Sequence, residues 1–355
     1  MTSAGGRIVI AGAGSIGCYV GGCLALAGKD VTFLGRPRIV ESLTRGGLHV
    51  TDLDGRDRHV SPASITATDD ATAALSRAAV VLVTVKSGAT GDMAELIARY
   101  APSDCAVVSL QNGVGNRDRI AAVVGSRPVF AGMVPFNVIL DEAATPIRVH
   151  RGTEGGLVID AKAGAIASRL ACDGLTVETQ ADMPAVLWGK LLLNLNNALN
   201  ALSGLPLATE LADRRWRSLL AMQMDEALAA MGANGIRPAK LAGVPPRFLP
   251  TILRLPDWLF TRIARRMLAI DPEARSSTWE DLMRGRPTEI DEFQGAIMRL
   301  AEKSGTPVPL TRRIVKAVRD AEAAGSGPPS LDPSDLLSRS GLSIWSKWYD
   351  PVQPN

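Results

Sequence analysis

A glycine pattern near the N-terminus constrains the fold more than any other feature of this chain. Residues 8–10 form a short apolar run, and a G-x-G-x-x-G sequence follows at residues 12–17. An apolar run that ends at glycine is typical of a buried parallel strand. The first glycine of the pattern permits a tight turn, the second lets the backbone approach a pyrophosphate, and the third lets the next helix pack against the strand. The loop predicted to bind a dinucleotide consists of Gly12, Ala13, Gly14, Ser15, Ile16 and Gly17.

The surroundings of this loop favour a dinucleotide site over a glycine-rich turn that binds nothing. A helix is expected over residues 15–27, with its first amides facing the phosphates, and a second strand over residues 31–34. A strand, the glycine pattern, a helix and a second strand, in that order, are the context that supports the motif.

The end of the second strand indicates which dinucleotide binds. Proteins that bind NAD usually carry Asp or Glu there, which holds the ribose 2′-hydroxyl. This chain has Gly35-Arg36-Pro37-Arg38 instead. Because a guanidinium group forms two parallel hydrogen bonds with a phosphate, we predict NADP(H), with Arg36 as the main contact. Arg38 is either a helper or a solvated surface charge.

Composition limits the class of protein. The 355 residues are enough for roughly two domains. With 46% hydrophobic and 21% charged residues, the chain is globular rather than disordered. A net charge of +3 is too small to indicate a nucleic-acid partner. The isolated histidines and the four cysteines show no metal-ligand spacing, so we predict no metal.

The start of the chain and its apolar runs give no sign of export or membrane insertion. The opening MTSAGG lacks the charged and apolar regions of a signal peptide. No apolar run approaches the ~20 residues that span a bilayer. The cysteines look like small buried residues of a reduced protein, so we expect a cytoplasmic protein.

Strand and helix patterns alternate up to about residue 180. Strands are expected at residues 78–85, 105–110, 128–132, 156–159 and 176–178, a hairpin at 48–60, and helices at 37–46, 91–100 and 161–172. This alternation predicts an α/β fold with a Rossmann-type, doubly wound parallel sheet.

From residue 182 onward the pattern is helical. Helices are expected at residues 184–202, 214–233, 249–268, 288–304 and 310–324. The predicted organisation is an NADP-binding domain over residues 1–180, a helical domain for substrate binding and dimerisation over residues 181–325, and a tail over residues 326–355. Because the tail carries Trp345, Trp348 and Tyr349, we expect it to dock on its own chain or on a partner subunit.

One expected helix carries polar residues that need a reason. Lys190, Asn194 and Asn197 fall at helical spacing, on one stripe among leucines. Asn is a poor helix former, and burying its amide costs about 1–3 kcal/mol unless it is bonded. For Asn196 and Asn200, a structural role and a functional role stay equally open. A lysine in an apolar stripe needs a task or a partner.

A partner for Lys190 is available in the segment 285–291. Glu289 and Asp291 follow a proline near an expected helix start, where negative charge is favoured. Capping of the first helical turn is a sufficient reason for the presence of Asp291. Upstream, Ser276, Ser277 and Thr278 precede Glu280 and also fit a capping box.

Further short motifs follow the glycine pattern and Arg36 in a fixed order. They are V-x-V-K at residues 83–86, Q-N-G at 111–113, L-W-x-K-L-x-x-N at 187–194 and T-E-I-D at 288–291. With these motifs the chain resembles the ketopantoate reductase (2-dehydropantoate 2-reductase) family over roughly residues 7–320. The resemblance implies a helical second domain of the 6-phosphogluconate dehydrogenase C-terminal type, and a homodimer.

The resemblance also implies roles for single residues. In that family the lysine matching Lys190 is the catalytic acid, and the glutamate matching Glu289 supports it. The asparagine matching Asn112 lies between cofactor and substrate, and the serine matching Ser277 binds the substrate carboxylate. Lys86 and Asn194 match further active-site positions. The predicted catalytic residues are Lys190 and Glu289, the substrate-binding residues Asn112, Asn194, Asn197 and Ser277, and the further cofactor-binding residues Arg36, Lys86 and Asn112.

Some positions depart from the family pattern. Family members often have a second asparagine four residues after the one at Asn194, where this chain has Ala198. An asparagine often found three residues before the serine corresponds to Ala274. The segment 243–268 is also longer than in the shortest members. In the family these positions would contact the substrate, so the departures bear on which substrate binds and leave the hydride transfer unaffected.

The resulting prediction is the NADPH-dependent reduction of a 2-oxo acid, ketopantoate in first place, within pantothenate biosynthesis. An alternative is another branched or bulky 2-oxo acid, because the apolar segment 248–268 either lines a larger pocket or packs as helices. A non-catalytic NADP-binding regulator ranks lower, because Lys190 and Glu289 are both present. Membrane-surface attachment through Arg254, Arg262, Arg265 and Arg266 ranks lowest, since basic helix faces are usually solvated.

Overall fold

The computed structural model describes residues 6–240, 243–263 and 273–337. The chain forms two compact units, Met1–Trp188 and Gly189–Asn355, and each is described by itself. Among the described helices, none combines the length and the apolar character needed to cross a membrane.

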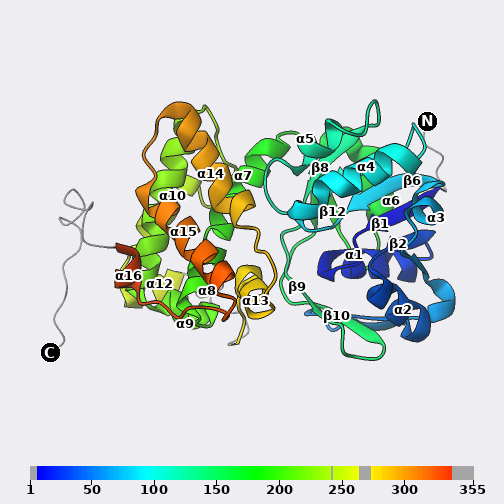
Figure 1. The fold of residues 1–355 in the computed structure, drawn as a ribbon, viewed down its shortest axis with the longest axis horizontal. Helices are drawn as coiled ribbons and strands as arrows, with labels where there is room; N and C mark the ends of the chain where they lie inside the picture. The colour runs from blue at the N-terminus through cyan, green and yellow to red at the C-terminus, as the bar shows by residue number, and fades with distance from the viewer. Residues whose placement is uncertain (1–5, 241–242, 264–272, 338–355) are drawn as a thin grey trace. The chain divides into compact units, whose positions relative to one another are not determined.

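The first unit is built on a sheet of eight strands in the order β12-β11-β8-β7-β6-β1-β2-β5 (Figure 1). The strands are β1 (Arg7–Ala11), β2 (Val31–Leu34), β5 (Thr66–Thr68), β6 (Ala78–Val83), β7 (Ala106–Ser109), β8 (Val129–Met133), β11 (Leu157–Asp160) and β12 (Val177–Gln180). All neighbouring pairs are parallel except β11 and β8, which are antiparallel. The order turns outward in both directions from β1, as in a doubly wound sheet.

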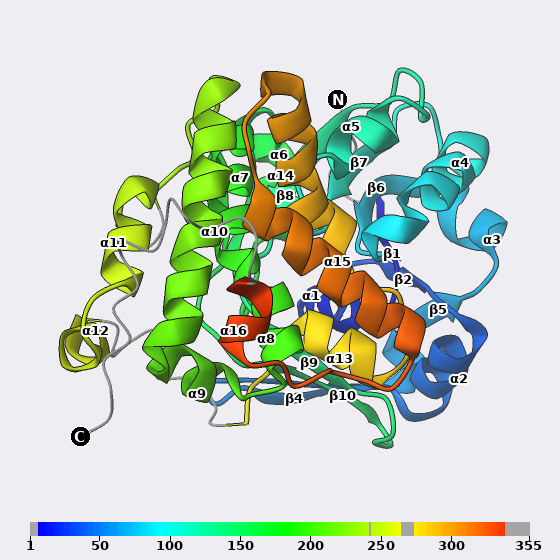
Figure 2. The same ribbon diagram turned by 60° about the vertical axis from the view of Figure 1, so that its left-hand side comes forward.

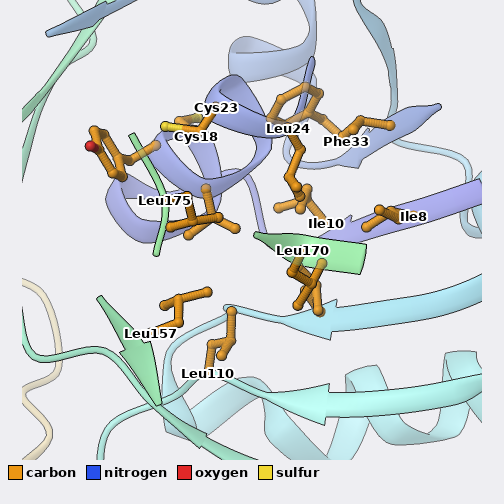
Figure 3. Close-up of a cluster of buried hydrophobic side chains, with 14 of the residues drawn as sticks. Ile8, Ile10, Cys18, Cys23, Leu24, Phe33, Leu110, Leu157, Leu170 and Leu175 are labelled. Atoms are coloured by element: carbon orange, nitrogen blue, oxygen red, sulfur yellow. The ribbon is translucent and has the colours of Figure 1, made fainter. Parts of the chain in front are cut away.

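Helices cover both faces of this sheet. They are α1 (Ser15–Leu26), α2 (Pro37–Gly46), α3 (Ala71–Leu75), α4 (Thr90–Tyr100), α5 (Asn116–Ala121) and α6 (Gly164–Leu170). Because alternate residues of a strand point to opposite faces, Ile8 and Ile10 pack with α1 and α6, while Val9 packs with α3, α4 and α5. Figure 3 shows the first of these cores, in which Cys18 and Leu24 of α1 lie beside the sheet.

A second, smaller sheet in the order β4-β3-β10-β9 closes this core. Its strands are β3 (Leu48–Asp52), β4 (Asp57–Val60), β9 (Val138–Asp141) and β10 (Ile147–Arg151). The hairpin expected at residues 48–60 is confirmed as β3 and β4, with Gly55 at φ +83° in the turn. Strands β9 and β10 were not predicted, because their apolar residues alternate with charged and polar ones over only a few positions.

The second unit is helical apart from its loops (Figure 2). Its helices are α8 (Asn196–Ser203), α9 (Leu207–Ala212), α10 (Arg214–Ala233), α11 (Leu249–Leu253), α12 (Asp257–Ile263), α13 (Ser277–Met283), α14 (Ile290–Ser304), α15 (Pro309–Ala324) and α16 (Pro333–Leu337). Helix α7 (Met183–Asn194) contains the division between the units. The α/β class, the mostly parallel sheet and the helical second part are thus confirmed.

Three expected elements need correction. The helix expected at 184–202 is interrupted at Leu195, so it forms α7 and α8. The helix expected at 249–268 is broken at the Leu255-Pro256 step into α11 and α12, because proline cannot continue the helical hydrogen bonding; residues 264–268 lie outside the described residues. The third is the sheet, since the predicted parallel arrangement holds for every neighbouring pair except β8–β11, which is antiparallel.

The beginning of the predicted tail packs on its own unit. The amide of Leu331 donates to the carbonyl oxygen of Leu202 at 2.8 Å, and Arg215 pairs with Asp332 at 3.1 Å. Helix α16 then contacts α10 and α15. Trp345, Trp348 and Tyr349, on which the docking prediction rested, lie outside the described residues.

Candidate active site

The glycine loop between β1 and α1 is held close to the end of β6. Gly12 has φ +118°, and a Cβ atom built on it would lie 2.6 Å from the backbone nitrogen of Val85. The hydroxyl of Thr84 donates to the carbonyl oxygen of Gly12 at 2.7 Å. At Gly17 a Cβ atom would lie 2.1 Å from that same carbonyl oxygen. Close contacts therefore require the first and third glycines, and these contacts let α1 start directly beside β1.

Gly14, in contrast, faces open space. A Cβ atom built on Gly14 would meet no atom within 4 Å. Gly14 is also the N-cap residue of α1, and no side chain of the described residues caps this helix. Ser15 and Ile16, which follow, are half-buried, and Ala13 is buried. An open backbone surface at the uncapped start of a 12-residue helix fits the pyrophosphate of a dinucleotide.

Arg36 lies next to this loop. It is the N-cap residue of α2, directly after Gly35, at which a Cβ atom would lie only 2.9 Å from the Cβ atom of Ala13. The Arg36 side chain is exposed, and within the described residues no carboxylate pairs with it. Arg38 is exposed as well. A guanidinium beside the loop, with no acidic residue at the strand end, suits an extra phosphate on the ribose.

Asn112 lies in the loop after β7, and its backbone is firmly held. Its carbonyl oxygen accepts from the side-chain amide of Asn116 at 2.6 Å and from the Ser87 hydroxyl at 3.3 Å. The side-chain amide of the preceding residue, Gln111, donates to the carbonyl oxygen of Val85 at 2.9 Å. The two loops that carry Asn112 and Lys86 are therefore one hydrogen-bonded structure. Lys86 is exposed at the start of the turn that contains Ser87.

The sequence analysis missed the residues that build this support. Ser87, Thr90, Gln111 and Asn116 are buried polar side chains that bond to one another, with Gln111 donating to the Thr90 hydroxyl at 2.7 Å. Polar side chains just beyond the ends of two apolar strands were the available signal, since the ends of neighbouring parallel strands meet at one edge of a sheet.

In the second unit, Lys190 and Glu289 are close enough to interact. Lys190 lies near the end of α7, and Glu289 is the N-cap residue of α14; both side chains are half-buried. Burial lowers the pKa of Lys190 to about 8, while the negative charge of Glu289 opposes this by favouring the ammonium form. The predicted partner relationship is therefore present in the structure. A lysine whose pKa lies near neutrality is suited to donate a proton.

Asn194 and Asn197 follow Lys190, but on two helices rather than on one. Asn194 is the last residue of α7, and Asn197 belongs to the first turn of α8. Both side chains are half-buried, and neither amide is hydrogen-bonded within the described residues. Unpaired amides at this depth remain able to bind a polar ligand.

Ser277 is exposed at the start of α13, and its position is set by the residue before it. The backbone amide of Ser276 donates to the side-chain oxygen of Asn200 at 2.9 Å. The Ser276 hydroxyl donates to the carbonyl oxygen of Asn197 at 2.9 Å and accepts from the Trp279 amide at 3.2 Å. The capping residue is thus Ser276, which leaves the Ser277 hydroxyl outside the cap.

A buried carboxyl group supports this arrangement. Glu210 of α9 is only 1% exposed and accepts from the side-chain amide of Asn200 at 2.6 Å. Burial raises the pKa of Glu210 to about 8, against the opposing hydrogen bonds from Asn200 and Asn196. Asn196 and Asn200, whose roles the sequence left open, therefore contact this carboxyl. Asn200 has a structural role, since its hydrogen bonds connect α8 with α9 and with the start of α13.

The titratable residues outside this arrangement include the cysteines, three of which are buried. No group of three or more His, Cys, Asp or Glu side chains there is arranged around a possible metal position. The cysteines are free thiols, and burial raises the pKa of Cys18 and of Cys105 to about 12. Such thiols are protonated at neutral pH and are poor nucleophiles.

The predicted residues therefore form two groups, one in each unit. The first unit holds Gly12, Ala13, Gly14, Ser15, Ile16, Gly17, Arg36, Lys86 and Asn112. The second holds Lys190, Asn194, Asn197, Ser277 and Glu289.

Comparison with known proteins identifies the family for both parts of the chain. Residues 8–164 match the model of the family described as ketopantoate reductase PanE/ApbA, and residues 182–322 match the model of its C-terminal part. The chain belongs to the ketopantoate reductase family. A 2-dehydropantoate 2-reductase of Halobacterium salinarum is 30% identical over 332 residues, which are 90% of this chain and all of the relative.

Solved structures give the same result. A ketopantoate reductase of the PanE/ApbA family from Ralstonia eutropha has a TM-score of 0.75 and 30% identity, and the match covers 90% of this chain and 99% of the other. A D-mandelate dehydrogenase solved with NADH and anilino(oxo)acetate has a TM-score of 0.73 at 20% identity, over 90% and 99% of the two chains, which shows a shared fold. As a member of this family, the chain is an oxidoreductase that acts on a C=O/CH–OH group and uses a nicotinamide cofactor.

Proposed function

We propose that the chain reduces 2-dehydropantoate (ketopantoate) to pantoate with NADPH, as a step of pantothenate biosynthesis. The observation that carries the proposal is the placement of Lys190. Lys190 is half-buried, its pKa is lowered, and it interacts with the carboxylate of Glu289. The side-chain amides of Asn194 and Asn197, which follow it in the chain, make no hydrogen bond within the described residues. Curated relatives that cover 89–90% of this chain are named 2-dehydropantoate 2-reductases, which supports the substrate.

In this proposal, residues of the second unit donate the proton and stabilise the negative charge on the substrate. NADPH, when bound, supplies the hydride that the carbonyl carbon receives. Lys190, as the ammonium, stabilises the negative charge that develops on the carbonyl oxygen and donates the proton that completes the hydroxyl group. Glu289 favours the charged form of Lys190 and fixes its direction. Asn194 and Asn197 orient the substrate, and Ser277 binds its carboxylate.

The residues of the first unit hold the cofactor. Gly14 and the start of α1 receive the pyrophosphate, and Arg36 receives the 2′-phosphate. Lys86 and Asn112 lie on the loops at the ends of β6 and β7, where ligands bind in open α/β sheets. The neighbour solved with NADH is only 20% identical, so its cofactor does not decide the choice for this chain.

A bulkier 2-oxo acid is a second candidate substrate. Ala198 and Ala274 stand where family members often carry asparagine, so two amides that would restrict the substrate are missing. The fold also accommodates an aromatic ligand, since the D-mandelate dehydrogenase was solved with anilino(oxo)acetate. A panel of 2-oxo acids, assayed with NADPH, separates the two substrates by kcat/KM.

The variant Lys190→Ala tests the proposal directly. Because the ammonium acts only on the reacting oxygen, we expect kcat to fall about 10²-fold or more while NADPH affinity stays nearly unchanged. Lys303→Ala, at an exposed position in the last turn of α14, is the matched control and should keep wild-type turnover. Normal turnover of Lys190→Ala would remove Lys190 from the mechanism.

Two further expectations stay predictions. A ketopantoate reductase from Staphylococcus aureus is described as dimeric, and a homodimer is the proposed assembly for this chain, to be measured by light scattering in solution. The cytoplasmic location stays a prediction from the sequence.

A further inference from the structure

The junction between α7 and α8 separates the residues of the proposed site. Helix α7 ends at Asn194 and α8 starts at Asn196, so Leu195 interrupts the helix. The amide of Leu195 still donates to the carbonyl oxygen of Leu191 at 3.0 Å. Leu195 keeps helical dihedral angles, with φ −57° and ψ −28°, and it lies one residue after Asn194 and two before Asn197.

Gln294 of α14 reaches this junction. Its side-chain nitrogen Nε2 donates to the carbonyl oxygen of Leu195 at 3.0 Å. Gln294 is 0% exposed, and its other polar atom, Oε1, is without a hydrogen-bond partner among the described residues. A fully buried amide with a single bond is costly in a helix core, so its presence needs a reason. Its one bond goes to the backbone atom at which α7 is interrupted.

The spacing of two contacts shows what that bond can do. Glu289 interacts with Lys190, and Gln294 bonds to Leu195. Lys190 lies in α7, and Leu195, five residues later, follows its end. Glu289 is the N-cap residue of α14, and Gln294, also five residues later, lies in that helix. Two contacts with equal spacing, one at each end, fix how far α14 slides along α7.

We infer that Gln294 is a positioning residue that holds α14 in register with α7 and thereby keeps the Glu289 carboxylate opposite the Lys190 ammonium. Gln294 touches neither substrate nor cofactor in this assignment; it acts through Glu289. The inference rests on the proposed function of Lys190 as the proton donor.

Two other carboxylates lie in the first turn of α14, close to Glu289 in the sequence. Asp291 pairs with Arg319 at 2.6 Å and lies at an exposed position, while Glu292 is buried one turn after Glu289. Glu289 is the group whose charge raises the pKa of Lys190. Losing the register therefore weakens one identified interaction, and the pKa of Lys190 should fall.

The variant Gln294→Met tests the inference, because methionine keeps the volume and removes the bond to Leu195. Since the ammonium form of Lys190 is required, the alkaline limb of the pH profile of kcat for reduction should move to lower pH by about half a unit or more. The KM for NADPH should not change. Gln223→Met is the matched control: Gln223 of α10 is also 0% exposed, and within the described residues neither of its polar atoms has a partner. Its pH profile should match that of the wild type.

A second measurement separates this inference from the proposed function. The pKa of Lys190 is followed by NMR of the protein labelled at lysine 13Cε, which needs no turnover. Gln294→Met should lower that pKa, and in the Glu289→Gln background it should have no further effect. An unchanged Lys190 pKa in Gln294→Met, or an equal shift in Gln223→Met, would overturn the inference. Absence of 2-oxo acid reduction by the wild type would instead overturn the proposed function.

Discussion

At the scale of single residues, the chemistry depends on the charge state of Lys190. Burial pulls its pKa down to about 8, and Glu289 resists that change. The balance leaves most molecules with an ammonium group at neutral pH, yet one that gives up its proton far more easily than an ordinary lysine. A proton donor works best when its pKa lies near the working pH, so the pair is suited to reduction at neutral pH.

The sign of the pH dependence follows from this pair. Reduction requires the protonated lysine, so kcat should fall as the pH rises through about 8. Glu289→Gln removes the negative charge that favours the ammonium, so it should move this limb to lower pH. A profile that is flat up to pH 10, or a limb that moves upward in Glu289→Gln, would show that another group limits the reaction. Stopped-flow rates of NADPH oxidation between pH 6 and 10 provide the measurement.

At the scale of the elements, α8 is organised around a carboxyl group with no place in the proposed mechanism. Glu210 bonds to Asn200, which in turn holds the amide of Ser276 at the start of α13. In the described residues, Glu210 Oε1 and Asn196 Oδ1 are both buried and lack a hydrogen-bond partner. A neutral carboxyl has a hydrogen to donate, which an ionised carboxylate lacks. The raised pKa of Glu210 agrees with a neutral group at pH 7.

Stability should therefore depend on pH through Glu210. A carboxyl whose pKa rises from 4.5 in the unfolded chain to about 8 in the folded one stabilises the fold fully at low pH and loses this contribution as the pH approaches 8. We expect the wild-type Tm to drop by about 5 °C between pH 6 and 8, from roughly 2 kcal/mol of lost stability. Glu210→Gln, which imitates the neutral acid, should remove most of that drop. Differential scanning calorimetry measures both proteins.

Lys190 does not produce this effect. Its lowered pKa contributes in the opposite direction and mainly above pH 8, because its folded value lies below its unfolded value of 10.5. The same Tm drop in wild type and Glu210→Gln would therefore assign the pH dependence to groups other than Glu210.

Long elements with a clear period could be predicted, and interruptions of them could not. The expected helix at 214–233 coincides with α10, which starts behind the capping side chain of Asp213. The interruption at Leu195 escaped prediction, because leucine and asparagine carry no breaker signal. The carbonyl oxygen at this interruption accepts a bond from Gln294, 99 residues away. Tertiary contacts of this kind override local preference, and a single sequence does not display them.

At the scale of the whole molecule, the predicted site divides along the chain. The glycine pattern and Arg36 could be predicted because each has a local sequence signature. The glycines mark the backbone turn that receives a pyrophosphate, and Arg36 is a cation directly after the second strand. The segment 285–291 offered Glu289 and Asp291 as partners for Lys190, and the family resemblance pointed to Glu289. The support around Asn112 stayed hidden, since Gln111, Ser87 and Asn116 meet only once β6 and β7 are paired.

The division makes cofactor binding separable from chemistry, which a thermal measurement can show. NADPH that binds only the folded protein should stabilise it by about 2.7 kcal/mol at 100 times its Kd, and raise Tm by roughly 5–10 °C. Since the predicted phosphate contacts lie in the first unit, Lys190→Ala should keep this shift. Arg36→Ala should lose most of it at the same NADPH concentration, whereas its response to NADH should stay close to that of the wild type. An equal loss for both cofactors would mean that Arg36 supports the loop rather than the 2′-phosphate. A wild type stabilised as well by NADH as by NADPH would contradict the preference for NADP(H), and Arg45→Ala, at an exposed position in the last turn of α2, serves as the control for loss of a positive charge on that helix.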